Sequence, residues 1–351
     1  LQNHGANGSN MLARKKKVTL SDIADAVGVS RALVGKVLGG GNSNIRVSEE
    51  TARMIREAAE RLHYQPNLSA RMLTGQSSHL IGILIDAQPP PVTFRTLAFI
   101  DKYAAENGYR LLIGEAHNSI DSLYHHYSNF MQYNVDGVIC LAHDYPGQEE
   151  KLQELFRDAE NIVFVEKPVL PDACCVEIDR AAAVEELTSL LLRTRKRVGI
   201  IMEDPSYHSI RQRKDGYCRA MEKAGMDRQW IHFLPDEQVS LEELMHRAIT
   251  EFVLPEQLDA LIAPNDLAAS YLMRELLQRG FRIPEDIAVA GFDNEPFSGS
   301  LYPSLTTIDD NNEEIGKYAF DLLLEQLNEK RSVHHKHSVC VTPRIVWRES
   351  I

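Results

Sequence analysis

The stretch Thr19–Leu38, TLSDIADAVGVSRALVGKVL, has the pattern of two short amphipathic helices joined by a tight turn. Thr19 followed three residues later by Asp22 is typical of a capping box, Gly28 breaks the first apolar face, and Ser30 suits the N-cap of a second helix. Such a helix-turn-helix can place its second helix in a DNA major groove. Any small helical hairpin gives a similar pattern, so the flanking residues decide between the two interpretations.

The residues on either side of this stretch favour the DNA-binding interpretation. A basic run, Arg14–Lys17, precedes it and suits a phosphate backbone. A third amphipathic helix is predicted over Ser48–Leu62, with Ser48 as its N-cap. Pro66 and Gly75 then fit the start and end of a further short helix.

Charge is divided unevenly along the chain. The formal net charge is -12, which argues against DNA binding for the chain taken as a whole. Residues 1–76, however, hold 11 Lys and Arg against 6 Asp and Glu, whereas the remaining residues hold 27 against 44. The basic N-terminal part is therefore the part expected to contact DNA.

After Gly75 the chain alternates between apolar runs and amphipathic segments, which indicates two lobes with parallel sheets covered by helices. The predicted strands are Leu80–Ile85, Tyr109–Gly114, Asp136–Leu141, Ile162–Val165, Val198–Met202, Leu258–Ala263 and Ile287–Phe292. The predicted helices are Phe94–Asn107, Leu123–Tyr133, Leu152–Glu160, Ala181–Arg193, Arg211–Ala224, Leu267–Arg279 and Ile315–Leu327.

Other features bear on location and chemistry. No apolar run is long enough for a membrane span and no signal segment follows the N-terminal charges, so we expect a cytoplasmic protein without membrane contact. The five cysteines lack metal or redox spacing. His334, His335 and His337 fit a solvated loop better than a metal site. We expect no cofactor, no metal and no catalytic activity.

Several runs together resemble the lactose/galactose repressor (LacI/GalR) family of bacterial transcription regulators. They are VTLSDIADAVGVS from Val18, IRVSEETARMIREAAERLHYQPN from Ile45, ARMLTG from Ala70, APNDLAA from Ala263, IPEDIAVAGFDN from Ile283 and PSLTTI from Pro303. They occur in the family's order and extend the resemblance from Val18 to Ser350.

The resemblance implies a fold and a domain plan. The fold class is a small all-α helix-turn-helix DNA-binding domain plus an α/β two-lobed periplasmic-binding-protein-like core with parallel sheets. The expected domains are a disordered tail and basic arm (1–17), the helix-turn-helix domain (18–65), a hinge helix and linker (66–78), and the effector-binding and dimerisation core (79–351).

The resemblance also implies DNA contacts. Arg31, Ala32 and Lys36 match positions that read bases, and Thr19, Ser30, Thr51 and Tyr64 match positions that contact phosphates. Leu73 matches a leucine that wedges into the minor groove, with Asn67, Leu68 and Arg71 on the same short helix. Leu33, Gly35 and Gly39 depart from the family's usual polar residues, and Lys36 replaces a more usual Arg.

For the effector, the resemblance implies Arg213, Asp293, Asn265, Phe94 and Glu166, which follow or face the carboxyl ends of predicted strands. The alternatives are a helix cap for Asp293 or Asp266, and a surface ion pair of Arg213 with Asp215 or Glu203. The implied function is a repressor that binds a palindromic operator as a homodimer and responds to a small molecule. A carbohydrate is the first expectation for that effector, with a nucleobase or a protein co-regulator behind it; a solute-binding protein without a DNA role is the rival.

Overall fold

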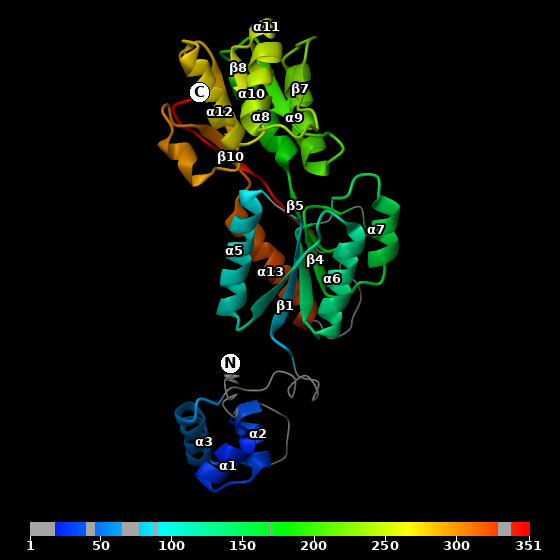
Figure 1. The fold of residues 1–351 in the computed structure, drawn as a ribbon, viewed down its shortest axis with the longest axis vertical. Helices are drawn as coiled ribbons and strands as arrows, with labels where there is room; N and C mark the ends of the chain where they lie inside the picture. Colours follow the sequence, from blue (N-terminus) through cyan, green and yellow to red (C-terminus); the bar gives the residue numbers. More distant parts are fainter. Residues whose placement is uncertain are drawn as a thin grey trace, which may run out of the picture. The chain divides into compact units, whose positions relative to one another are not determined.

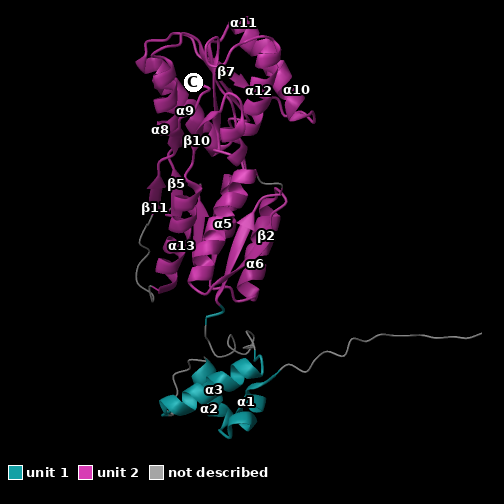
Figure 2. Cartoon of the chain, turned by 90° about the vertical axis from the view of Figure 1, so that its left-hand side faces the viewer, with its two compact units in different colours: residues 1–78 teal, residues 79–351 magenta. Residues whose placement is uncertain are grey.

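The computed structural model of the chain describes residues 18–39, 46–64, 77–87, 90–142, 144–168, 170, 172–328 and 338–351. The chain divides into two compact units, Leu1–Ser78 and His79–Ile351, which are coloured separately in Figure 2. The predicted hinge-helix residues Asn67, Leu68, Arg71 and Leu73, and the histidines of the predicted solvated loop, lie outside the described residues.

The N-terminal unit is a three-helix domain, as the sequence pattern predicts. Its helices are α1 (Leu20–Val27), α2 (Arg31–Gly39) and α3 (Glu49–Arg61). The predicted capping box is present, because the Asp22 backbone N–H donates to the Thr19 hydroxyl and the Thr19 N–H donates to the Asp22 carboxylate. Ile23, Val34 and Ile55, one from each helix, are fully buried and form the centre of a small core.

The second unit has two lobes, each built on a six-stranded sheet (Figure 1). The first sheet is entirely parallel in the order β11-β5-β4-β3-β1-β2. Helices α5 and α13 pack on one face and helices α6 and α7 on the other, because their apolar residues belong to two separate clusters. The elements are β1 (Leu80–Ile85), β2 (Arg110–Glu115), β3 (Gly137–Cys140), β4 (Ile162–Val165), β5 (Cys175–Ile178), β11 (Ser338–Val341), α5 (Pro91–Glu106), α6 (Ile120–Gln132), α7 (Glu149–Phe156) and α13 (Asn312–Asn328).

The second lobe repeats this plan in the order β12-β10-β9-β8-β6-β7, with only the β10–β12 pair antiparallel. One large apolar cluster joins its sheet to its helices. The elements are β6 (Val198–Met202), β7 (Trp230–Phe233), β8 (Ala260–Ile262), β9 (Ala288–Phe292), β10 (Thr306–Asp309), β12 (Arg344–Val346), α8 (Arg180–Leu191), α9 (His208–Lys223), α10 (Leu241–Arg247), the π-helix η1 (Ala248–Val253), α11 (Leu254–Glu256), α12 (Asp266–Gln278) and the 3-10 helix η2 (Pro296–Ser300).

In the described part of the chain, three segments connect the lobes. They run from β5 to α8, from β10 to α13 and from β11 to β12. The Asp179 N–H donates to the Val341 carbonyl at 2.9 Å, so the first and third connections lie side by side. Because the strands of both lobes end near these connections, their carboxyl ends face the region between the lobes, where open α/β sheets bind ligands.

Candidate functional site

Helix α2 presents the residues that the sequence assigns to base reading. Arg31 and Ala32 are exposed in its first turn, and Lys36 is half-buried one turn later. The Ser30 hydroxyl accepts a hydrogen bond from the Leu33 N–H at 3.3 Å, which holds the start of the helix. Exposed side chains at a helix N-terminus suit contact with base edges.

Other predicted DNA contacts also have structural roles in this unit. Thr51 shares a 2.8 Å hydrogen bond with the Ser48 hydroxyl at the start of α3. Tyr64 packs half-buried against the three-helix core, and this burial raises the pKa of its hydroxyl. Leu33 packs against the same core, which explains why an apolar residue replaces the usual polar one.

In the second unit, Glu166 and Asp293 lie at corresponding places in the two lobes. Glu166 directly follows β4 and Asp293 directly follows β9. Their backbones have φ of 75° and 92°, in the left-handed region that residues other than glycine seldom adopt. Strained backbone of this kind clusters at functional sites, so both carboxylates are credible ligand groups.

Arg213 is buried in α9 and held rigidly from two sides. Its Nη1 donates to the Pro264 carbonyl at 2.7 Å, and its guanidinium carbon lies 3.9 Å from the centre of the Phe292 ring. The surface ion pair with Asp215 or Glu203 is therefore not formed, and the Nε atom has no hydrogen-bond partner among the described residues. Phe292 directly precedes Asp293, so the fold brings the two main predicted effector residues together.

Burial raises the pKa of Asp293 to about 7, and the nearby carboxyl groups of Asp310 and Asp266 add to the effect. The guanidinium groups of Arg213 and Arg180 oppose it. Arg180 and Asp310 lie at two of the connections between the lobes, and Arg213 and Asp266 lie on α9 and α12 of the second lobe. Asp293 is therefore part of a cluster of charged groups near the lobe connections.

Arg180 is a member of this cluster that the sequence did not indicate. It is the first residue of α8, and only 7% of its surface is exposed. Its Nη2 donates to Glu166 Oε1 at 2.8 Å and its Nε donates to Asp310 Oδ2 at 2.9 Å. The adjacent pair Asp309-Asp310, at the end of β10, was the available signal, because buried carboxylates require cationic partners.

Asn265 and Phe94 are also predicted at the effector site. The side chain of Asn265 is hydrogen-bonded within the protein, whereas that of Phe94 is exposed. Asn265 caps α12, because its side-chain oxygen accepts from the Ala268 N–H at 2.8 Å. The N-cap of α12 is therefore Asn265, and Asp266 is the first residue of the helix rather than its cap. Phe94 lies on α5 with 51% of its surface exposed, which leaves the ring free to contact a ligand.

Arg95, next to Phe94, connects the lobes. Its Nη1 donates to the Asn294 carbonyl at 2.7 Å, and its Nη2 donates to the Asp293 carbonyl. Helix α5 belongs to the first lobe, whereas both acceptors follow β9 of the second. An effector beside Asp293 would therefore act directly on a contact between the lobes.

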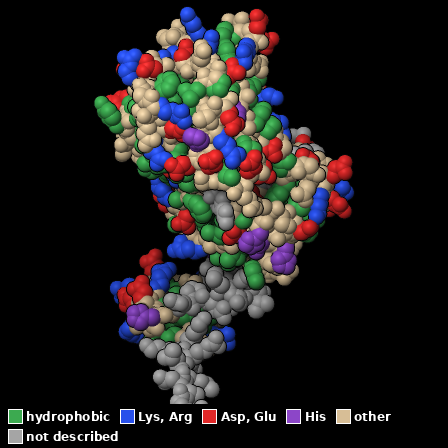
Figure 3. Space-filling view, turned by 45° about the horizontal axis from the view of Figure 1, so that its top comes forward, with side chains coloured by type: hydrophobic (Ala, Val, Ile, Leu, Met, Phe, Trp, Pro, Cys, Tyr) green, Lys and Arg blue, Asp and Glu red, His purple; other side chains and the backbone are tan. Residues whose placement is uncertain are grey.

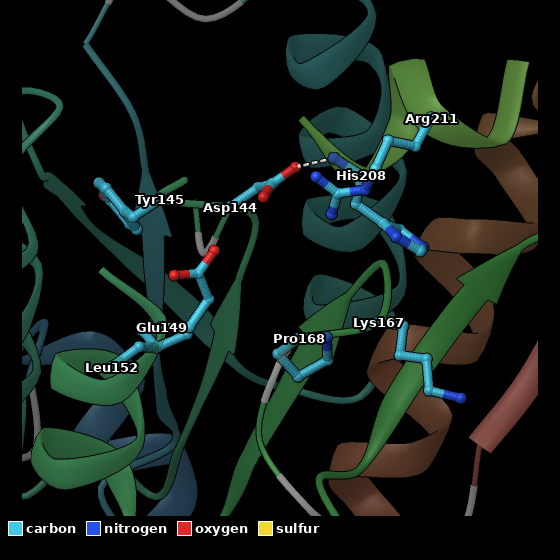
Figure 4. A pocket seen from close by; sticks show the side chains of 8 residues that line it. All are labelled: Asp144, Tyr145, Glu149, Leu152, Lys167, Pro168, His208 and Arg211. Carbon is cyan, nitrogen blue, oxygen red and sulfur yellow. Dashed lines mark hydrogen bonds between the residues drawn. The ribbon is translucent and has the colours of Figure 1, made fainter. Parts of the chain in front are cut away.

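A cavity also lies between the two lobes (Figure 4). It holds about 360 Å³ of empty space, part of it open to solvent, and both lobes line it. The His208 N–H, at the start of α9, donates to Asp144 Oδ2 at 2.6 Å across this region. The lining residues are Asp144, Tyr145, Glu149, Leu152, Lys167, Pro168, His208 and Arg211.

Outside this region, acidic and basic side chains are interspersed on the face of the molecule in Figure 3. In the described ranges, no group of three or more His, Cys, Asp and Glu side chains is placed to hold a metal ion. No described helix is both long and apolar enough to cross a membrane.

Family models match both units. Residues 19–67 match the model described as bacterial regulatory proteins, lacI family, and residues 187–351 match a periplasmic binding protein-like domain. The first match covers the three helices α1, α2 and α3, and the second covers most of the second lobe and the end of the first.

Similar proteins extend these matches over nearly the whole chain. The transcriptional repressor PurR of Serratia proteamaculans is 28% identical over 337 residues, 95% of this chain and 96% of that protein. PurR of Pasteurella multocida is 26% identical over 95% of this chain and 98% of its own length. These relatives are repressors rather than enzymes.

Solved structures share the fold. The Lac repressor dimer bound to operator and the anti-inducer ONPF has a TM-score of 0.80 at 20% identity, covering 95% of this chain and 99% of that chain. The regulator CelR in complex with cellobiose has a TM-score of 0.66 at 20% identity, covering 95% of this chain and all of that chain. With its helix-turn-helix unit and two-lobed periplasmic-binding-protein-like core, the chain belongs to the LacI/GalR family of transcription regulators.

Proposed function

We propose that this protein is a cytoplasmic repressor that binds a palindromic DNA operator as a homodimer and changes its operator affinity when a small molecule binds between the lobes. The proposal rests on the presence of two features in one chain. The N-terminal unit has an exposed α2 N-terminus, and the core has the Arg213–Asp293 cluster. Arg31 can bond a guanine bidentately, and its neighbours on α2 can extend that contact.

The effector is proposed to act through the contacts between the lobes. Arg95 bonds the backbone at Asp293, and Asp144 bonds the start of α9. A ligand that favours one lobe arrangement over the other shifts the equilibrium by its difference in affinity, and operator and effector are then coupled reciprocally. Couplings of this type are typically about 1–3 kcal/mol.

A carbohydrate is the first proposed effector class. Guanidinium groups donate to hydroxyl oxygens and carboxylates accept from hydroxyl hydrogens, so Arg213 and Asp293 together suit a hydroxylated ring. A nucleobase is the second class, because the PurR relatives cover nearly the whole chain.

The test is selection of bound duplexes from a random pool at stated salt, because protein–DNA affinity depends steeply on salt. An enriched palindrome is the expected result. Its affinity is then measured with cellobiose, ribose, hypoxanthine and guanine in turn, and a change with one of them identifies the effector class. Salt-sensitive binding without any enriched sequence would contradict the proposed function.

A further inference from the structure

The charge balance around Asp293 favours a particular kind of effector. Four carboxyl groups meet there, those of Asp293, Asp310, Asp266 and Glu166. The guanidinium groups of Arg180 and Arg213 act on Asp293, and that of Arg348 acts on Asp266. Arg95, which bonds the Asp293 carbonyl, is paired with a further carboxylate, that of Glu295. The site therefore has more negative than positive groups when its carboxyls are ionised.

Arg180 cannot correct this excess, because two carboxylates already share it. Its Nη2 lies 2.8 Å from Glu166 Oε1 and 2.7 Å from Asp310 Oδ2. One cation thus compensates two anions in a place where only 8% of the Arg180 side chain is exposed. Burial weakens solvent screening, so the remaining charge acts strongly on anything that binds nearby.

Arg213 leaves the carboxylate of Asp293 without a bonded cation. Arg213 itself donates to the Pro264 carbonyl and lies over the Phe292 ring. No side chain or backbone group in the described ranges donates a hydrogen bond to the Asp293 carboxylate. The nearby Asp266 carboxylate accepts hydrogen bonds from Ser298 and Thr307, which are neutral hydroxyl donors and supply no compensating charge.

Buried atoms without partners point to the same conclusion. Among the described residues, Asp310 Oδ1 accepts no hydrogen bond although Asp310 is only 5% exposed. Glu203 Oε2, at the carboxyl end of β6, is also buried without a donor. Arg180 Nη1 and Arg213 Nε lack acceptors. Buried polar atoms without hydrogen-bond partners are unfavourable, so a ligand that supplies both donors and an acceptor would be favoured.

We propose that the effector of this protein is a small organic cation, in which a protonated amine faces Asp293 and Asp310 while a hydroxyl or ring oxygen accepts from Arg213. This inference rests on the proposed effector site and adds the charge of the ligand. An amino sugar is one member of the class. Ligands that carry a phosphate or carboxylate are disfavoured, because they would add negative charge beside four carboxyl groups.

The test compares three small probes of nearly equal size on the full chain. Ethanolamine carries an ammonium and a hydroxyl, ethylene glycol replaces the ammonium with a hydroxyl, and glycolate replaces it with a carboxylate. Binding is followed by saturation-transfer NMR at constant ionic strength. We expect ethanolamine to bind roughly tenfold more tightly than ethylene glycol, as one partly screened charge pair provides, and glycolate to bind most weakly.

Single substitutions test which side chain causes the preference for ethanolamine. Asp293→Asn should remove most of the preference for ethanolamine, and Asn tolerates the left-handed backbone at this position. Glu115→Gln is the matched control, because Glu115 also ends a strand but lies on the edge strand β2 with its side chain 46% exposed.

The outcomes separate this inference from the proposed function. Absence of ethanolamine binding, equal binding of ethylene glycol, or an unchanged preference in Asp293→Asn would each overturn the cationic effector. None of these results would alter an operator selected from the random pool. Conversely, a missing operator would leave the charge preference measurable.

Discussion

Arg180 Nε donates a 2.9 Å hydrogen bond to Asp310 Oδ2, and this bond joins the first connection between the lobes to the second. A comparable bond joins the third connection to the second, because Arg344 Nη2 lies 3.0 Å from Asp309 Oδ2. Two adjacent aspartates therefore receive arginines from the two flanking connections. The two ion pairs differ in burial, since the side chain of Arg344 is 67% exposed and that of Arg180 is 8% exposed.

Arg180→Gln should lower the free energy of unfolding of the core by about 3–5 kcal/mol, because it leaves buried carboxylates without their cation. Arg344→Gln should cost at most about 1 kcal/mol, as exposed ion pairs do. Urea unfolding of both variants and the unchanged chain measures the difference. Equal losses in the two variants would show that burial does not set the strength of these pairs.

A close approach of α8 and α9 gives a second prediction. A Cβ atom on Gly216 would lie 2.2 Å from the Ala181 carbonyl oxygen and 3.0 Å from its Cα, so the backbone of α8 would have to shift. Gly216→Ala should therefore destabilise the core by about 1–3 kcal/mol. Gly299→Ala is the control, because the nearest atom to its Cβ, Arg348 Nε, is 3.7 Å away. Thermal unfolding should shift for the first variant only.

Asp293 should make the stability of the core depend on pH. Its pKa is about 7 in the folded protein, and an unfolded aspartate has a pKa of about 3.9. Between these values the folded state binds more protons, so the free energy of unfolding falls as pH rises, by at most about 1.4 kcal/mol per pH unit. Below both values this contribution no longer changes with pH.

The check is urea unfolding of the unchanged chain and of Asp293→Asn from about pH 5 to about pH 8. The variant should show a flatter dependence. Part of the slope should remain, because burial also raises the pKa of Asp266. Parallel pH curves for the two proteins would mean that the carboxyl of Asp293 titrates as it does in the unfolded chain.

Continuous apolar runs made part of the fold predictable. The predicted strands Leu80–Ile85, Ile162–Val165 and Val198–Met202 agree with β1, β4 and β6 residue for residue, because buried parallel strands are apolar on both faces. Strands β5, β7, β10, β11 and β12 were not predicted. β5 contains Glu177 and β10 contains two threonines, so neither reads as an apolar run.

Helix starts were harder to predict than helix bodies. Helix α9 begins at His208, three residues before the predicted Arg211, since Ile210 is the single apolar residue of its first turn and the residues around it are polar. Helix α5 begins at Pro91, before the predicted Phe94. A proline at the first helical position needs no N–H partner, and this signal was available in the sequence.

At the proposed effector site, the family resemblance selected Asp293 and Glu166, and the sequence predicted that each directly follows an apolar strand, as the structure has it. Neither could identify Arg180 or Arg95. Their partners Asp310 and Asn294 are 130 and 199 residues away in sequence, and only the two-lobed fold brings them together.

The last prediction concerns the role of Arg31 in DNA binding. It is exposed in the first turn of α2, where a guanidinium can reach both acceptors of a guanine. Arg31→Ala should weaken binding to the selected operator by about 1–3 kcal/mol and relax the base preference at one position of each half-site. Arg53→Ala is the control, since Arg53 is exposed on α3 near Glu50 and Glu57. Fluorescence anisotropy at several salt concentrations separates the two roles, because loss of a phosphate contact lowers the salt dependence while loss of base reading does not. If both variants lost affinity equally for operator and random duplex, α2 would not be the base-reading helix.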